Sequence, residues 1–493
     1  MKPNTRRAVR LTGGRAVRIA RTTLPLLGMV LLVPATLPGQ TGENRRYPIK
    51  DARDIMPREM GIDLPDGPVE AWTGNVTTVD EDGRGCVARV VCRVGEHYVV
   101  MLPDGRIVGR KNDDADPTDR EFEPATGEQV GKNIVQDRLR GFQVLTTKHF
   151  VFVYNTTPEF AEVTSKVMES MLKGLMDFCE KQGIQVHEPE VMLPVIMFNR
   201  EQQFQSYEPM PGQVMAYYQI ASNRVILHEE SSLSAMSNEL ARQQLLSTIA
   251  HEGAHQILHN IGVQQRLSRW PLWLGEGLAE YMAPTKPGFR FAWKGAGKVN
   301  DLRMWELERA LQKQFINGFD GSTVDGTVHS GVLDSTGYAA AWTLTHYLAK
   351  NRKEDFDRYI RYLSRMPPLM GMLPDAPSPE PTVDGNLVHF RKFFGEDLET
   401  LENEMVKYMA RQKYESPFGE LPHLVALCEI PGDEGTIKHA CFYVDEGSIK
   451  EWQKTVIDSL TADQQEQAKF SKPMAFRNRG EANRFIKKWK REK

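Results

Sequence analysis

The chain of 493 residues contains little cysteine, five residues in all. None of the five has the paired spacing of a zinc knuckle, which excludes that class of protein. Cys86 and Cys92 lie six residues apart on one expected strand, which holds them too far apart to form a disulfide. Cys428 and Cys441 could face each other across a hairpin that turns near 433–435. The sequence leaves open whether these two form a disulfide or remain buried thiols.

Long apolar runs are also scarce. The longest, at 24–33, is too short and too rich in proline to span a bilayer comfortably. Residues 1–40 carry basic residues and no acidic ones, and this pattern is typical of an export signal. An uncleaved membrane anchor is the alternative. We therefore expect an exported protein, periplasmic or extracellular, without stable membrane insertion once residues 1–40 are removed.

The charges nearly cancel, with 62 Lys and Arg against 65 Asp and Glu. Without the seven basic residues of 1–40 the balance becomes 55 against 65, a net charge of -10. An acidic protein of this kind is not expected to bind nucleic acid. The hydrophobic content of 40% and charged content of 26% are those of a soluble globular protein. The length predicts several domains.

The most informative segment is His-Glu-Gly-Ala-His at 251–255, within an expected helix over 240–261. Histidines four residues apart point from one face of a helix, so His251 and His255 could bind one metal ion. Glu252 lies beside that face, where it could act on a metal-bound water. Glu276 follows after 20 intervening residues, which leaves room for a turn and a second helix. Two His and one Glu, with a fourth position open to water, are the ligands of a hydrolytic zinc site. The alternative is a pair of core histidines on a buried helix.

Together with Trp-Leu-Gly-Glu-Gly at 273–277, this segment resembles the gluzincin zinc metallopeptidases (peptidase MA-like). The closest likeness is to the bacterial exported domain-of-unknown-function family 1570, over roughly 144–408. The resemblance implies a mostly helical, thermolysin-like core with a small mixed sheet, Zn²⁺ as the metal and Glu276 as its third ligand. Many gluzincins have Asn where this chain has Gly275, which removes a possible contact but not a ligand.

Other polar residues lie near these ligands in the sequence. Glu280 shares a helix face with Glu276, and we expect it to accept a hydrogen bond from the ring N–H of a ligating histidine. Tyr338 matches a tyrosine that hydrogen-bonds the oxyanion in aminopeptidase-type gluzincins; packing at a helix end is the alternative. We expect His259 to lie too near the helix end to bind the metal, and His346 to belong to the core.

The predicted fold is α+β and multidomain. Alternating apolar and polar residues predict the strands of 69–115, and an apolar stripe predicts a helix over 158–181. Beside the catalytic core, we expect a small SH3-like β-barrel before it and a small α+β module after it. The hairpin within 214–228 is a candidate edge strand for binding an extended peptide, or a plain sheet edge. The predicted boundaries are a signal at 1–40, a linker at 41–68, the barrel at 69–115, an acidic linker at 116–141, the catalytic domain at 142–413 with its zinc helices within 240–283, and the C-terminal module at 414–493.

From these features we predict an exported zinc-dependent metallopeptidase. It would hydrolyse peptide bonds of a peptide or protein substrate with a zinc-activated water, and Glu252 would be the general base. Two alternatives remain at this stage. One is a catalytically silent binding or scaffolding protein with a structural or vestigial zinc site. The other is a hydrolase of a non-peptide amide.

Overall fold

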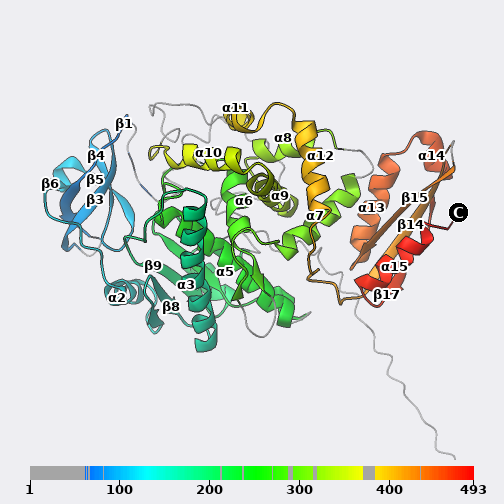
Figure 1. The fold of residues 1–493 in the computed structure, drawn as a ribbon. Helices are drawn as coiled ribbons and strands as arrows, with labels where there is room; N and C mark the ends of the chain where they lie inside the picture. The colour runs from blue at the N-terminus through cyan, green and yellow to red at the C-terminus, as the bar shows by residue number, and fades with distance from the viewer. Residues whose placement is uncertain are drawn as a thin grey trace, which may run out of the picture.

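The fold is described from a computed structural model. It covers residues 62, 64 and 67–492, except 81–82, 211–213, 236–237, 269, 287–291, 315–318, 370–382 and 433–434. The predicted signal at 1–40 and most of the predicted linker at 41–68 lie outside these residues. The described part is mixed α+β with several small sheets, arranged as an N-terminal sheet, a central unit and a C-terminal module (Figure 1).

The N-terminal sheet has six strands in the order β5-β4-β3-β2-β6, with β1 paired to β3. Strands β5 and β6 are its two edges and do not pair with each other, so the predicted barrel is an open sheet within the described residues. An alternation of apolar and polar residues fits both a closed barrel and an open sheet. It shows that one face of the sheet is buried, but not whether the first and last strands pair. The strands are β1 (Val69–Glu70), β2 (Asn75–Val79), β3 (Gly85–Val94), β4 (His97–Met101), β5 (Ile107–Lys111) and β6 (Asp116–Thr118).

The stretch 116–141, predicted to be a linker, is instead structured. It contributes β6, which pairs with β2, and helix α2 (Gly127–Asp137). The side chain of Thr126 accepts from the backbone N–H of Gln129, and the Gln129 side chain accepts from the backbone N–H of Thr126. This capping box satisfies donors that a helix start leaves free, and its Thr-x-x-Gln pattern is readable in the sequence.

The central sheet has the order β10-β11-β9-β8-β7, with β8, β9 and β11 parallel. All residues of β8 and β9 are buried, as expected for parallel strands covered on both faces. Helices α3 and α5 pack on one face, while α2 and α4 contribute to the apolar cluster on the other. The predicted helix from Pro158 is confirmed, with Thr157 as its cap. The elements are β7 (Gln143–Thr146), β8 (Phe150–Tyr154), α3 (Pro158–Lys181), β9 (Leu193–Phe198), α4 (Glu201–Tyr207), β10 (Ala216–Gln219) and β11 (Arg224–His228).

A mostly helical region follows, and its apolar residues form one cluster with the inner face of the central sheet. Helix α9 lies at its centre and contacts α6, α7, α8, α10 and α12. The elements are η3 (Ser232–Ala235), α5 (Asn238–Asn260), α6 (Leu272–Met282), β12 (Thr285–Lys286), β13 (Ala292–Trp293), α7 (Asp301–Gln314), α8 (Ser322–His329), α9 (Ser335–Asn351), α10 (Lys353–Ser364), α11 (Val383–Phe394) and α12 (Leu398–Met409).

The C-terminal module is the predicted α+β unit, a four-stranded sheet with α13 against one face and α15 against the other. In its long hairpin Cys428 pairs with His439, and Cys441 pairs with Ala426. The two cysteines are therefore not directly opposite, and both are free, buried thiols. The elements are β14 (His423–Gly432), β15 (Gly435–Tyr443), α13 (Glu446–Asp458), α14 (Ala462–Gln467), β16 (Lys469–Phe470), β17 (Met474–Phe476) and α15 (Arg479–Trp489).

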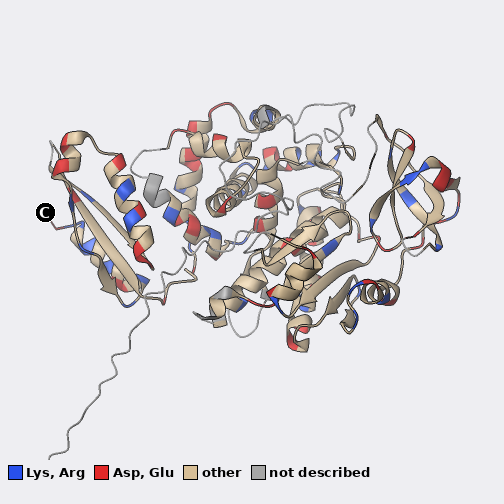
Figure 2. Ribbon diagram, turned by 180° about the vertical axis from the view of Figure 1, so that it is seen from behind, with Lys and Arg blue, Asp and Glu red and all other residues tan. Residues whose placement is uncertain are grey.

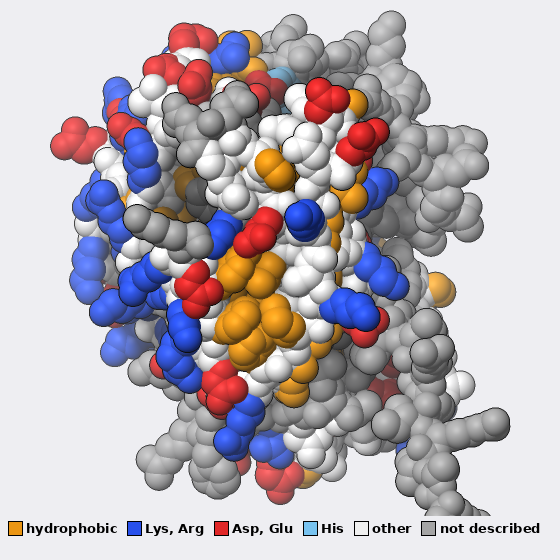
Figure 3. All heavy atoms as spheres, turned by 90° about the vertical axis from the view of Figure 1, so that its right-hand side faces the viewer, with side chains coloured by type: hydrophobic (Ala, Val, Ile, Leu, Met, Phe, Trp, Pro, Cys, Tyr) orange, Lys and Arg blue, Asp and Glu red, His pale blue; other side chains and the backbone are white. Residues whose placement is uncertain are grey.

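Charged residues of both signs are spread over all three parts of the ribbon (Figure 2). The end formed by the C-terminal module shows an apolar patch bordered by Lys and Arg side chains (Figure 3). Among the described helices, none combines the length and apolar character needed to cross a bilayer.

Candidate metal centre

Helix α5 carries the two histidines, and its fit against α3 depends on a glycine between them. A Cβ atom at Gly253 would lie 2.5 Å from the sulfur of Met168 on α3. The lack of a side chain there lets α5 approach α3, while the opposite face presents His251 and His255. The buried apolar residues of α5 include Leu246, Ile249 and Ile257, which recur at helical spacing.

Helix α6 brings the carboxylate of Glu276 to the histidines. Pro271 precedes its first turn, and most of its residues are buried. A Cβ atom at Gly277 would lie 2.3 Å from Thr345 Oγ1 and 2.5 Å from the backbone oxygen of Ala341, both on α9. The backbones of α6 and α9 therefore touch at Gly277. This contact fixes the helix that carries Glu276.

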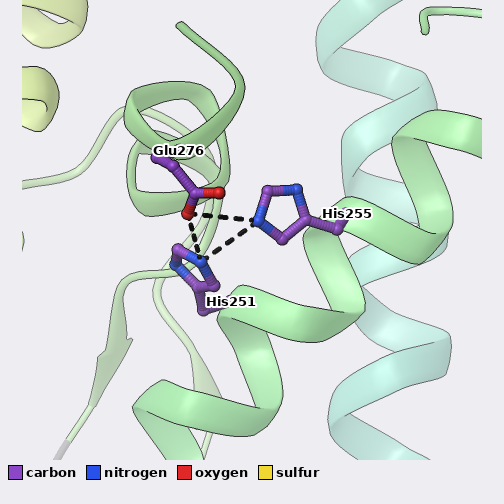
Figure 4. Close-up of side chains that lie close together, drawn as sticks. All are labelled: His251, His255 and Glu276. Atoms are coloured by element: carbon purple, nitrogen blue, oxygen red, sulfur yellow. Dashed lines mark hydrogen bonds and ion pairs between the residues drawn. The ribbon is translucent and has the colours of Figure 1, made fainter. Parts of the chain in front are cut away.

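The side chains of His251, His255 and Glu276 converge (Figure 4). Nε2 of His251 lies 3.1 Å from Glu276 Oε2 and 3.1 Å from Nε2 of His255, and the latter is 3.4 Å from Glu276 Oε2. A tetrahedral zinc ion with bonds of about 2.0–2.1 Å holds its ligand atoms about 3.3 Å apart. The three atoms therefore already have the mutual spacing of a metal-ligand set. This buried group could hold a metal ion.

The electrostatics of the three groups fit a cation between them. Burial alone would raise the pKa of Glu276, but the His255 and His251 imidazoles hold it far below its usual range. Burial alone would lower the pKa of His251, but Glu280 and Glu276 raise it. The carboxylates thus favour positive charge at this point, and a metal ion can supply that charge.

Glu280 lies behind His251. Its Oε1 is 3.0 Å from His251 Nδ1 and accepts a 2.6 Å hydrogen bond from Arg303, while its Oε2 accepts a 2.7 Å bond from Asn300. Arg303 also donates to Glu306 at 2.7 Å. Against the effect of burial, Arg303 and His251 lower the pKa of Glu280 to about 2. An ionised Glu280 fixes the ring of His251 so that Nε2 faces the site.

Glu252 lies next to the ligands and close to the edge strand β10. Burial raises its pKa to about 7, although the His251 and His255 imidazoles and a hydrogen bond from the backbone N–H of Tyr218 act in the opposite direction. Strand β10 is an outer strand of the central sheet, as the sequence predicted for this hairpin.

Tyr338, in the first turn of α9, is also brought to the site. Its ring centroid is 6.0 Å from that of His251, and Arg303 lies over the ring with Cζ 5.1 Å from the centroid. The hydroxyl is buried and has no hydrogen-bond partner among the described residues. Burial, reinforced by Glu276 and Glu252, raises its pKa well above the usual value, so it remains a proton donor.

The sequence did not single out Arg303 and Asn300, which hold Glu280. Both lie at the start of α7, where Asn300 also accepts from the backbone N–H groups of Leu302 and Arg303. An Asn before a helical segment signals a cap, but nothing in that signal predicts a contact with α6. His259 and His346 lie outside the ligand group: His259 stacks on Tyr218 in the last turn of α5, and His346 is buried in α9.

The fold and the site thus define a mixed α+β protein with a candidate metal centre between two helices. Residues 245–370 match the model of a family described as "Protein of unknown function (DUF1570)". The match confirms the resemblance to that family and contains all three candidate ligands, Glu252 and Tyr338. No curated protein matches the chain.

Proposed function

We propose that this protein is an exported zinc metallopeptidase of the gluzincin type, with a thermolysin-like core. The observation that carries the proposal is the convergence of two Nε2 atoms and one carboxylate oxygen, 3.1–3.4 Å apart, beside a buried glutamate. His251, His255 and Glu276 would hold the ion. Donors of this type in a tetrahedral arrangement suit zinc, and three protein ligands leave one position for substrate or water.

When bound, Zn²⁺ would activate a water and polarise the substrate carbonyl. Glu252 would accept the proton of the attacking water on a carboxylate oxygen and pass it to the nitrogen of the leaving amine. A pKa raised to about 7 lets one carboxyl group both accept and return a proton near neutral pH. The hydroxyl of Tyr338 would donate to the developing oxyanion. Open backbone groups of β10 would align an extended peptide.

The substitution Glu252→Gln tests this proposal. It keeps the shape of the side chain and leaves the three ligands in place, so the purified variant should retain one zinc ion per chain. Because the amide cannot accept the proton, cleavage of a peptide library should fall by about a hundredfold or more. Elemental analysis and mass spectrometry of the cleaved library provide the two measurements. Undiminished cleavage by the variant would exclude Glu252 from the reaction.

The same experiment separates the alternative functions. A wild-type protein that binds one zinc per chain and cleaves no peptide would favour a silent binding protein or a hydrolase of a non-peptide amide. Localisation is a separate test: a tagged full-length chain should be recovered outside the cytoplasm and lack residues 1–40.

A further inference from the structure

A pocket lies beside the metal centre along the axis of α5. Ser247 and Gln244 line it, and they precede His251 by four and seven residues on the same face of the helix. At about 1.5 Å per residue, Ser247 is displaced from His251 by about 6 Å along the helix. Thr285, beyond the end of α6, and Asn300, the partner of Glu280, line the pocket from the other side. Ser247 is therefore offset from His251 along α5 by about the length of two residues of an extended peptide.

The walls of the pocket are largely apolar. Leu240 and Phe418 line it and belong to one buried cluster with Trp305. The ring centroids of Trp305 and Phe418 are 4.5 Å apart. The segment before Phe418 is fixed because the backbone N–H of Glu415 donates to Asp301 Oδ1 at 3.1 Å. The chain leading to the C-terminal module thus forms a fixed side of the pocket.

One polar group in this lining has an unused donor. Gln244 is 6% exposed, and its Oε1 accepts a 2.7 Å hydrogen bond from Ser231. This bond fixes the orientation of the amide. Its Nε2 is buried and has no partner among the described residues. A buried donor without an acceptor is unfavourable, and a ligand carbonyl would relieve that cost.

Asn300 and Asp301, which also line the pocket, are already engaged. The amide nitrogen of Asn300 donates to Glu280, and Asp301 accepts from Glu415 and Lys294. The lining also contains the neutral side chains of Gln243, Ser247 and Thr285, but no lysine or arginine. The pocket thus offers largely apolar walls, neutral polar groups and no cation. A carboxylate would lose its hydration there without gaining a cationic partner, and it would approach Asp301.

We infer that this pocket binds an apolar side chain of the substrate within two residues of the scissile bond, and that Gln244 Nε2 donates to a neighbouring substrate carbonyl. This inference rests on the proposed peptidase function and names the substrate class. Leu240, Gln244 and Phe418 lie outside the family-matched residues 245–370.

Binding to the zinc-loaded full-length Glu252→Gln variant tests the inference without turnover. The probes are fluorescent peptides with blocked termini that differ at one position. Peptides with Leu or Phe at this position are compared with peptides that have Asp or Gly there. The apolar probes should bind about tenfold or more tightly, as expected for a side chain that fills an apolar pocket. Adding Ser247→Phe fills the pocket and should abolish this preference, with zinc content and melting temperature as checks on the fold.

Adding Gln244→Leu should weaken binding of all probes by about two- to tenfold, the effect of one lost hydrogen bond. The matched control is Gln182→Leu, because Gln182 also lines a pocket with an unpartnered amide atom but contacts α10 and not the metal centre. Equal affinity for apolar and acidic probes, or a preference that survives Ser247→Phe, would overturn the inference. If the apolar probes bind selectively but the wild-type protein cleaves no peptide, the inferred role of the pocket would stand and the proposed peptidase function would be wrong.

Discussion

At the residue scale, the centre depends on a chain of charges that alternate in sign. The His251 imidazole, whose positive charge the nearby carboxylates favour, faces Glu280, Glu280 faces Arg303, and Arg303 faces Glu306. All four side chains are almost completely buried. Buried charges of this kind are tolerated only when each is paired and hydrogen-bonded. Glu280 is therefore the residue through which α7 acts on the metal ligand.

The substitution Glu280→Gln tests this role. The amide keeps the size of the side chain beside Nδ1 of His251, but its negative charge is lost, so zinc affinity should fall by about 10- to 100-fold. Competition with a zinc chelator measures the affinity. Glu306→Gln is the matched control, since Glu306 contacts the other side of Arg303 and lies away from the histidines. If both variants lost the same zinc affinity, the effect would arise from the pairing of Arg303 and not from the contact between Glu280 and His251.

At the scale of elements, α6 is held between the metal ligands and α9 by a glycine contact. Gly277→Ala would place a methyl group against the backbone of α9, so the two helices must separate. We expect a loss of about 1–3 kcal/mol in the free energy of unfolding, together with weaker zinc binding. Thermal and denaturant unfolding provide the measurement.

Gly275, in the same helix, is the control for that prediction. A Cβ atom there meets nothing within 4 Å among the described residues. Gly275→Ala should therefore stabilise α6 by up to about 1 kcal/mol, because alanine favours helix over glycine. If both substitutions had the same effect, the contact between α6 and α9 would not be what positions Glu276.

The elements could be predicted best where one periodic pattern dominates. The helix from Pro158 to Lys181 has the predicted bounds, since its apolar stripe and its cap agree. Strand alternation located the N-terminal sheet but could not show that it stays open, because closure depends on pairing between distant strands. Helix α2 was missed because acidic, turn-rich composition outweighed a four-residue capping signal. Arg303 and Asn300 could not be found, since their contact with Glu280 joins the start of α7 to α6 across 20 or more residues.

At the scale of the whole molecule, the N-terminal sheet is joined to the central unit by one buried cation. Arg266 follows α5 and is 5% exposed. It donates to Gly105 O in the N-terminal sheet at 2.7 Å, to Ala221 O at 3.0 Å and to Ile220 O. The backbone N–H of Ile107 also donates to Ala221 O, at 2.8 Å. The open sheet is therefore anchored beside the turn that precedes β11, and thus beside the edge of the central sheet.

Arg266→Met should release this junction. Methionine leaves buried carbonyl oxygens without a donor, which should reduce the free energy of unfolding by about 3 kcal/mol or more. Limited proteolysis should then cut between the N-terminal sheet and the central unit. Arg89→Met serves as comparison, because Arg89 forms a half-exposed ion pair with Glu190 across the same junction and should contribute at most about 1 kcal/mol. Unchanged proteolysis of the Arg266 variant would argue against an anchoring role.

The separation of the candidate metal ligands from the neighbouring pocket has a practical consequence for inhibitor design. The three candidate ligands lie within 245–370, whereas Gln244 and Phe418 lie outside that segment. A metal-chelating group would therefore bind equally well to any protein that has the same two histidines and glutamate. Selectivity for this chain would have to come from a hydrophobic substituent that reaches past Ser247, so potency and selectivity could be optimised on separate parts of one compound.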